Sequence, residues 1–167
     1  MSYRPSVIPT GGRALSEEER VAIERDMEAI VLGSHLFKSL DLTQRAQLIE
    51  SAFVMIYDAG DVILREGDPG DTMFLVMEGT LRVETQGGAG NVHLAELGRG
   101  ACVGEVSVLT GAPRTATVTA ISDVTVATFA RHRVQRLLDQ SPKVRALLEQ
   151  LVEGRANDTV AKIIGQG

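Results

Sequence analysis

The residues with the clearest chemical potential lie in one segment, 100–118, which interrupts the alternation of short strands and turns around it. Glu105 begins an apolar stretch long enough for about one helical turn, whose free N–H groups and positive dipole end favour an anion. Gly104, directly before it, lets the backbone approach a ligand closely. Arg114 can donate two hydrogen bonds to a phosphate, and Glu105 can accept hydrogen bonds from a ribose hydroxyl. The segment therefore predicts an anion site beside a hydroxyl acceptor, the alternative for both charged residues being an ordinary surface ion pair.

Helices are expected before the strands that must hold this segment. Residues 1–15 contain prolines and glycines with few apolar side chains, which predicts a flexible arm. A Ser-Glu-Glu-Glu capping-box pattern opens the ordered part, and the apolar residues after it share one helical face, so a helix is expected over 16–33. A second helix is expected over 41–53, with a tight apolar elbow at 34–40 between the two.

From 54 to 130 the sequence changes to short β-branched runs separated by glycine-rich turns, which predicts antiparallel strands in a sandwich or small barrel. The expected strands are 61–64, 73–78, 80–85, 91–97, 115–121 and 124–129. A helix is expected over 131–139, and Ser141-Pro142 is typical of a new helix start. The apolar stripe of that last helix would consist of Val144, Leu147, Leu148, Leu151 and Val152. The expected organisation is thus an arm (1–15), helical elements (16–53), a β-roll (54–130) and C-terminal helices (131–167).

The composition is that of a packed soluble domain rather than of a disordered or fibrous chain. The 167 residues are 44% hydrophobic and 23% charged, enough for one core and too few for two full domains with linkers. The net charge of -5 gives no overall attraction to nucleic acid or anionic lipid. Any bound anion must therefore meet a local positive site.

Several classes of protein are excluded by what the sequence lacks. No apolar run is long enough to cross a bilayer and no secretory signal begins the chain, which predicts a cytoplasmic protein without membrane insertion. Cys102 is the single cysteine and cannot form an intramolecular disulfide. The three histidines, His35, His93 and His132, are far apart, so neither a metal site nor a metal-dependent enzyme is expected.

The order of residues in 100–118 resembles the phosphate-binding cassette of cyclic-nucleotide-binding domains: glycine–glutamate, a short apolar helix, then Pro-Arg-Thr-Ala-Thr-Val. The resemblance extends outward to 59–63, 65–71 and 73–79, which are similar to strands and a turn of that family. Residues 36–40 resemble the helix-loop-helix before the barrel in regulatory subunits of protein kinase A. The resemblance implies a mainly β fold with flanking α: an eight-stranded antiparallel jelly-roll, an N-terminal helix-loop-helix, and C-terminal hinge and lid helices.

The same resemblance implies a role for each residue of the cassette. Glu105 would hold the ribose 2′-hydroxyl, Arg114 would pair with the cyclic phosphate, and backbone amides of Gly104 and Ala116 would complete the phosphate cradle. Thr115 is similar to the residue of cGMP-preferring members, yet some cAMP-preferring channels also carry threonine, so both ligands stay open. The full set of expected ligand-binding residues is Val103, Gly104, Glu105, Val106, Arg114, Thr115, Ala116 and Arg155.

Two positions depart from the pattern of the family. Val103 stands where phenylalanine is common, a loss of volume that should alter the packing under the cassette. The last helix has no aromatic residue to stack on a purine, which leaves Arg155, or aliphatic contacts from Leu148 and Leu151, to cover the base. An ordinary solvated charge is an equal alternative for Arg155.

The resulting hypothesis is a cytoplasmic receptor for cAMP or cGMP that has no catalytic residues and no cofactor. It would signal to an unidentified protein effector through its flanking helices, and homodimer formation is left open. Too few residues follow Val152 for a helix-turn-helix, so no nucleic-acid partner is expected. The alternatives are an interaction protein of the same fold that has lost ligand binding, an enzyme of the cupin type, which the histidine placement disfavours, and a sensor fragment of a larger protein.

Overall fold

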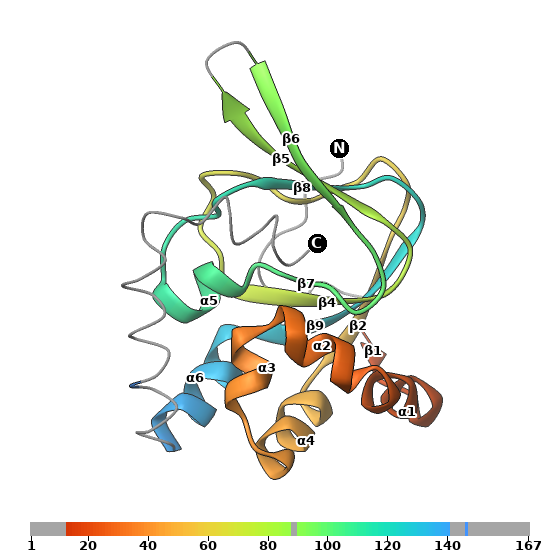
Figure 1. Cartoon of the computed structure of the whole chain (residues 1–167), viewed down its shortest axis with the longest axis vertical. Helices are drawn as coiled ribbons and strands as arrows, with labels where there is room; N and C mark the ends of the chain where they lie inside the picture. The colour runs from red at the N-terminus through yellow and green to blue at the C-terminus, as the bar shows by residue number, and fades with distance from the viewer. Residues whose placement is uncertain (1–12, 88–89, 141–145, 147–167) are drawn as a thin grey trace.

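A computed structural model of the chain describes residues 13–87, 90–140 and 146. In these residues two antiparallel sheets form a roll, and helices cover the outer face of one sheet (Figure 1). The first sheet has the strand order β1-β2-β9-β4-β7 and the second has the order β3-β8-β5-β6. The strands are β1 (Arg13–Ala14), β2 (Phe53–Tyr57), β3 (Val62–Leu64), β4 (Thr72–Glu78), β5 (Leu81–Gly87), β6 (Gly90–Leu97), β7 (Cys102–Val103), β8 (Thr117–Ala120) and β9 (Val124–Ala130).

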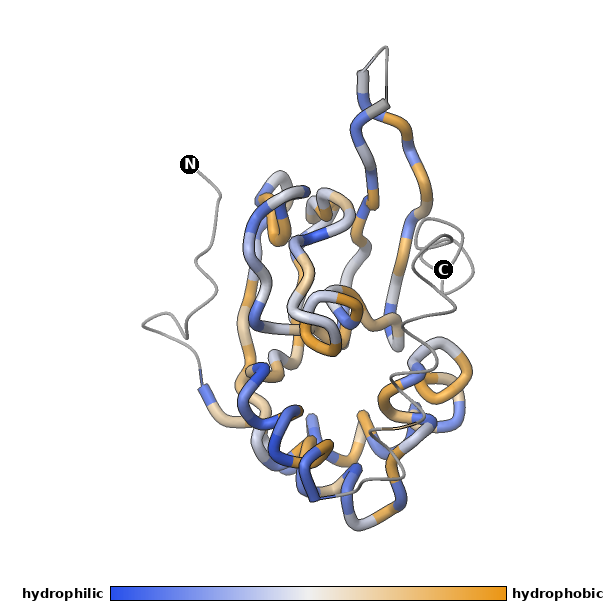
Figure 2. The backbone as a smooth tube through the Cα atoms, turned by 90° about the vertical axis from the view of Figure 1, so that its left-hand side faces the viewer, coloured by the Kyte–Doolittle hydropathy of each residue, from blue (hydrophilic) through white to orange (hydrophobic). Residues whose placement is uncertain are grey.

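This architecture confirms the mainly β fold with flanking helices. The described residues form nine strands, two of which have only two residues, where the resemblance implied eight. The β5–β6 hairpin extends beyond the roll at the end opposite the helices in both views (Figures 1 and 2). The helices packed on the first sheet and the β5–β6 hairpin therefore lie at opposite ends of the roll.

The helices are α1 (Glu17–Arg25), α2 (Met27–Gly33), α3 (His35–Ser39), α4 (Leu42–Glu50), α5 (Glu105–Thr110) and α6 (Arg131–Gln140). The capping box at Ser16 is confirmed: its side chain accepts the N–H of Glu19, and the carboxylate of Glu19 accepts the N–H of Ser16. The α6 helix matches its expected range closely. The expected last helix after Ser141 lies outside the described residues, as do residues 1–12 of the expected arm.

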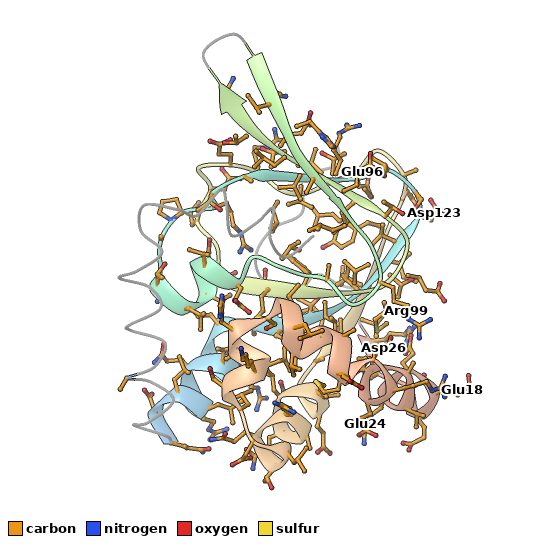
Figure 3. All side chains as sticks on the ribbon, in the orientation of Figure 1. Glu18, Glu24, Asp26, Glu96, Arg99 and Asp123 are labelled. Atoms are coloured by element: carbon orange, nitrogen blue, oxygen red, sulfur yellow. The ribbon has the colours of Figure 1, made fainter. Side chains whose placement is uncertain are left out.

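The prediction of one continuous helix over 16–33 is wrong, because the helix divides at Asp26. The carboxylate of Asp26 accepts two hydrogen bonds from the Arg99 guanidinium, at 2.7 and 3.1 Å, and the two side chains point toward each other (Figure 3). Arg99 belongs to the loop between β6 and β7. The break therefore coincides with an ion pair that ties the N-terminal helices to the roll.

Other boundaries also differ from the sequence prediction, among them that of the expected strand 115–121, of which only Thr117–Ala120 forms β8. The elbow at 34–40 contains the short helix α3. The second helix ends at Glu50 rather than at residue 53, because Phe53 begins β2 and pairs with Thr128 of β9. Residues 13–14, expected in the arm, form β1 and pair with the start of β2.

The core consists of two groups of buried side chains on either side of the first sheet. One lies between this sheet and the helices and includes Phe37 and Phe129, whose rings meet edge to face with centroids 5.7 Å apart. The other fills the interior of the roll with aliphatic residues such as Leu81 and Val126, both completely buried. The helices are thus fixed to the sheet by a continuous apolar layer.

Candidate functional site

Two glycines set the course of the chain around α5. Gly104 precedes the helix with φ 83° and Gly111 follows it with φ 79°, both in the left-handed region that favours glycine. Immediately before Gly104, β7 pairs with β4 of the first sheet. The helix expected over 105–109 is confirmed and ends one residue later, at Thr110. The chain therefore turns away from the edge strand β7 at Gly104, forms α5, and turns again at Gly111.

Six of the eight expected ligand-binding residues surround one cavity of about 40 Å³ beneath α5. These six residues are Val103, Gly104, Glu105, Val106, Thr115 and Ala116. Aliphatic side chains of the roll also line the cavity: Leu64, Val83, Leu97 and Val118. Arg114 is not among the lining residues, and Arg155 lies outside the described part of the chain. The cavity thus brings polar groups of the cassette together with aliphatic side chains of the roll.

Glu105 is buried, with 3% of its surface exposed, so the surface ion-pair interpretation is wrong for this residue. Its Oε2 accepts a hydrogen bond from the Ser34 hydroxyl at 2.6 Å and one from the Leu36 N–H at 3.3 Å. Its Oε1 accepts the N–H of His35 at 3.3 Å. This contact cannot be predicted from a local sequence pattern, because the donors stand about seventy positions away at the start of α3. The carboxylate at the cavity is held by the N-terminal helices.

Arg114 is also buried, with 6% of its surface exposed, and its guanidinium is held at the start of β4. Its Nη1 donates to the carbonyl oxygens of Thr72 at 2.8 Å and Gly104 at 3.4 Å, and its Nη2 donates to Thr72 Oγ1 at 3.1 Å. A Cβ added at Gly70 would lie 2.5 Å from the Arg114 Nε, and one added at Gly104 would lie 2.8 Å from Nη1. Glycine at both positions therefore leaves the space that the guanidinium occupies.

The loop before β4 also carries Arg114 through backbone hydrogen bonds. The N–H of Arg114 donates to the carbonyl of Asp68 at 2.8 Å, and the carbonyl of Arg114 accepts the N–H of Gly67 at 2.9 Å. The glycines and proline of this loop predict only a turn. The glycine-rich turn therefore holds the backbone of Arg114 in place by two hydrogen bonds.

The thiol of Cys102 lies beside the carboxylate of Glu105 and stays neutral. Burial raises its pKa far above the usual range, and the nearby Glu105 charge raises it further, while a hydrogen bond with Ser34 acts in the opposite direction. A thiol in this state is a packing residue rather than a nucleophile.

Across the described ranges, no group of three or more histidine, cysteine or acidic side chains could hold a metal ion. The described helices also include none with the length and apolar character needed to cross a membrane.

Comparison with known proteins identifies the family. The family model described as "Cyclic nucleotide-binding domain" matches residues 54–141, more than half of the chain. A cyclic nucleotide-gated potassium channel of Mesorhizobium japonicum is 32% identical over 121 residues, which are 72% of this chain and 32% of the channel. The regulatory subunit of a cAMP-dependent protein kinase of Dictyostelium discoideum is 29% identical over 135 residues, 80% of this chain and 41% of the subunit. The chain therefore spans less than half the length of these relatives.

Solved structures agree with this assignment. The N-terminal domain of a transcriptional regulator from Streptomyces coelicolor superposes with a TM-score of 0.62 at 32% identity, covering 78% of this chain and 92% of that domain. The roll, the helices packed on it and the α5 segment are thus the jelly-roll fold of a regulatory rather than a catalytic family. On the match of the family model and on this fold, the chain belongs to the cyclic nucleotide-binding domain family.

Proposed function

We propose that the chain is a receptor for a purine 3′,5′-cyclic nucleotide, cAMP or cGMP, which it binds in the cavity beneath α5. The observation that carries this proposal is the lining of the cavity, which combines a buried carboxylate and the backbone of the cassette with aliphatic side chains of the roll. A cyclic nucleotide has the complementary division, with a polar phosphate and ribose at one end and a flat base at the other. The cavity lining therefore supports a cyclic-nucleotide ligand by its chemistry, in addition to the support from the family assignment.

Each polar group of the ligand has a proposed partner. Glu105 accepts the ribose 2′-hydroxyl, and the amides of Gly104 and Ala116 meet the phosphate oxygens. Arg114 pairs with the phosphate from its position against the Gly104 carbonyl, 3.4 Å from Nη1. Thr115 lies at the cavity, where a hydroxyl can accept from the guanine amino group of cGMP. Val103 and Val106 supply apolar contacts.

Occupancy is transmitted to a protein effector through the helices. Val108 of α5 belongs to the same buried group as Leu36 of α3 and Val134 of α6. A ligand that moves α5 must therefore disturb the packing of helices on both sides of it. The effector, a cytoplasmic location, homodimer formation and a role for Arg155 at the base remain predictions.

Isothermal titration calorimetry of the chain with cAMP, cGMP and a cyclic dinucleotide tests this function. One of the two mononucleotides is expected to bind and the dinucleotide is not, because the cavity has one phosphate-binding wall. Replacement of Arg114 by Ala should weaken binding by about 2 kcal/mol, or roughly thirtyfold. Replacement of Arg133, an exposed arginine of α6, by Ala makes the same change of net charge and should leave affinity unaltered.

Two results would contradict the proposal. If the folded chain gave no heat with either mononucleotide, the fold would belong to an interaction protein instead of a receptor. If Arg114→Ala and Arg133→Ala lowered affinity equally, the arginine of the cassette would act only through net charge.

A further inference from the structure

Ser34 connects the start of α3 to the carboxylate at the cavity. Its side chain, 1% exposed, accepts the N–H of Phe37 at 3.2 Å and so acts as the N-cap of α3. The same hydroxyl donates its proton to Glu105 Oε2 at 2.6 Å, the shortest of the hydrogen bonds described above for that carboxylate. A serine hydroxyl can do both at once because it has one donor and two acceptor positions. The Ser34 oxygen therefore contacts both the α3 helix and Glu105, in addition to its hydrogen bond with the Cys102 thiol.

The carboxylate of Glu105 is oriented by these donors. Burial of an ionised carboxylate is costly unless hydrogen bonds replace its lost water. Ser34 and the amide of Leu36 both donate to Oε2, whereas the amide of His35 donates to Oε1 at 3.3 Å. The two amides belong to the first turn of α3, whose N–H groups are available to an acceptor outside the helix. Without the hydroxyl, Oε2 would lose the shortest of these hydrogen bonds and keep the longer one to Leu36, so the carboxylate would be held less firmly about its last side-chain torsion.

We propose that Ser34 is a positioning residue for recognition of the ribose 2′-hydroxyl: by fixing Oε2, it sets the direction in which Glu105 accepts from the ligand. This inference rests on the proposed function, because it takes Glu105 as the acceptor for that hydroxyl. It predicts that a residue in the N-terminal helices, remote in sequence from the cassette, determines discrimination between ribose and deoxyribose. Hydrogen bonds to charged groups are strongly directional, so an acceptor that rotates loses most of its preference.

The measured quantity is the ratio of the dissociation constants for a 2′-deoxy cyclic nucleotide and its ribose counterpart. The probes are cAMP, cGMP and their 2′-deoxy analogues, titrated against the full chain. Replacement of Ser34 by Gly should lower this ratio by about tenfold, because ribose binding weakens while binding of the deoxy analogue stays within about twofold.

Ser34→Gly is the preferred variant because glycine is a tolerated N-cap. Ser34→Ala, which caps poorly, should lower the ratio equally although it lowers the unfolding temperature more. Ser34→Thr keeps the hydroxyl and should restore the ratio.

Ser39 gives a matched control within the same helix. Its hydroxyl donates to the carbonyl of His35 at 2.8 Å and makes no contact described with Glu105. Replacement of Ser39 by Ala removes a side-chain hydrogen bond of α3 and should leave the ratio unchanged. In a Glu105→Gln background, Ser34→Gly should have no further effect on the ratio, because the acceptor that it orients is already altered.

The outcomes separate this inference from the proposed function. If the wild-type chain binds neither cAMP nor cGMP, both are overturned. If it binds one of them and Ser34→Gly leaves the ratio unchanged, or weakens the ribose and deoxyribose ligands equally, only the role of Ser34 is overturned. A fall in the ratio for Ser39→Ala as large as that for Ser34→Gly would also overturn it, because the effect would then belong to the stability of α3.

Discussion

At the scale of single residues, the site depends on positions that carry no chemistry themselves. The guanidinium of Arg114 occupies the space that side chains at Gly70 and Gly104 would need. Gly104 has φ 83° and needs glycine for its backbone alone, but Gly70 has no such constraint. At Gly70 the absence of a side chain serves only the arginine. This separation makes Gly70 the cleaner position at which to test the site.

Replacement of Gly70 by Ala should push the Arg114 side chain out of place, because the new Cβ would lie 2.5 Å from its Nε. We expect cyclic-nucleotide affinity to fall by about 1–2 kcal/mol, as for a lost charge-assisted hydrogen bond. The fold should persist, since a side chain can move more easily than a backbone. In an Arg114→Ala background, calorimetry should show no further loss from Gly70→Ala.

Gly98 supplies the control for this prediction. A Cβ there would meet nothing closer than the Gly79 carbonyl oxygen at 3.9 Å, and no left-handed φ is required. Gly98→Ala should therefore bind like the wild type. Full additivity of Gly70→Ala with Arg114→Ala would contradict the expected displacement of the guanidinium.

The cassette was predictable from sequence because its residues are consecutive and their types are distinctive. Gly104, Glu105 and Arg114 were all identified this way, and six of the eight expected residues line one cavity. The partners of Glu105 and Arg114, among them Ser34 and Thr72, could not be predicted in the same way. Both are common polar residues in unrelated parts of the chain, and only the fold brings them to the cassette.

At the scale of elements, local sequence patterns predict the helices that begin with a capping motif. They do not predict elements whose conformation depends on pairing with a distant strand. The capping box placed the start of α1 at Ser16. By contrast, the apolar run of β2 could belong to a helix or a strand by its pattern, and its pairing with β9 decided the outcome. The division of the first helix at Asp26 likewise coincides with a contact to Arg99, more than seventy residues later. Contacts between residues so far apart cannot be predicted from a short stretch of sequence.

The attachment of α1 should depend on pH through Glu19. The Arg13 guanidinium, which donates two hydrogen bonds to this carboxylate, lowers its pKa from 4.5 to about 2, with the N-cap contacts to Ser16 acting in the same direction. A carboxyl group with a lowered folded pKa stabilises the fold above its unfolded pKa, and this stability is lost as pH falls from about 4.5 toward 2. The contribution is about 1 kcal/mol, because Arg13 is half exposed to solvent.

Urea unfolding of the wild type and of Glu19→Gln measures this contribution. The wild type should be more stable at pH 7, and the difference should shrink as pH falls from 4.5 toward 2. Glu24, an acidic residue of α1 that is exposed, provides the control, and Glu24→Gln should show little difference at any pH. A Glu19→Gln difference that persisted unchanged at pH 2 would show that the hydrogen bonds do not require the charge.

At the scale of the whole molecule, the described residues leave only a narrow cavity beneath α5. It holds about 40 Å³, whereas pockets for small organic ligands usually hold about 300–1,000 Å³. The roll wall is part of a packed core, so widening is expected to come from movement of α5. That movement must disturb the buried contact of Val108 with the groups around α3 and α6. Binding and helix rearrangement are therefore expected to be one process.

Rapid mixing of the chain with a fluorescent cyclic-nucleotide analogue should reveal this step. The observed rate is expected to level off as ligand concentration rises, because movement of α5 becomes limiting, and the initial slope should lie below about 10⁷ M⁻¹s⁻¹. Val108→Ala removes a side chain that is 1% exposed and holds α5 to the helices, so it should raise the plateau rate. Val54→Ala creates a similar loss in β2, at a valine that is 2% exposed and remote in sequence from α5, and should leave the plateau unchanged. An observed rate that rose linearly over the whole range of ligand concentration, with a slope near the diffusion limit, would contradict this prediction. It would mean that the cavity accepts the ligand without movement of the helices. The proposed transmission from ligand to effector would then lack its first step.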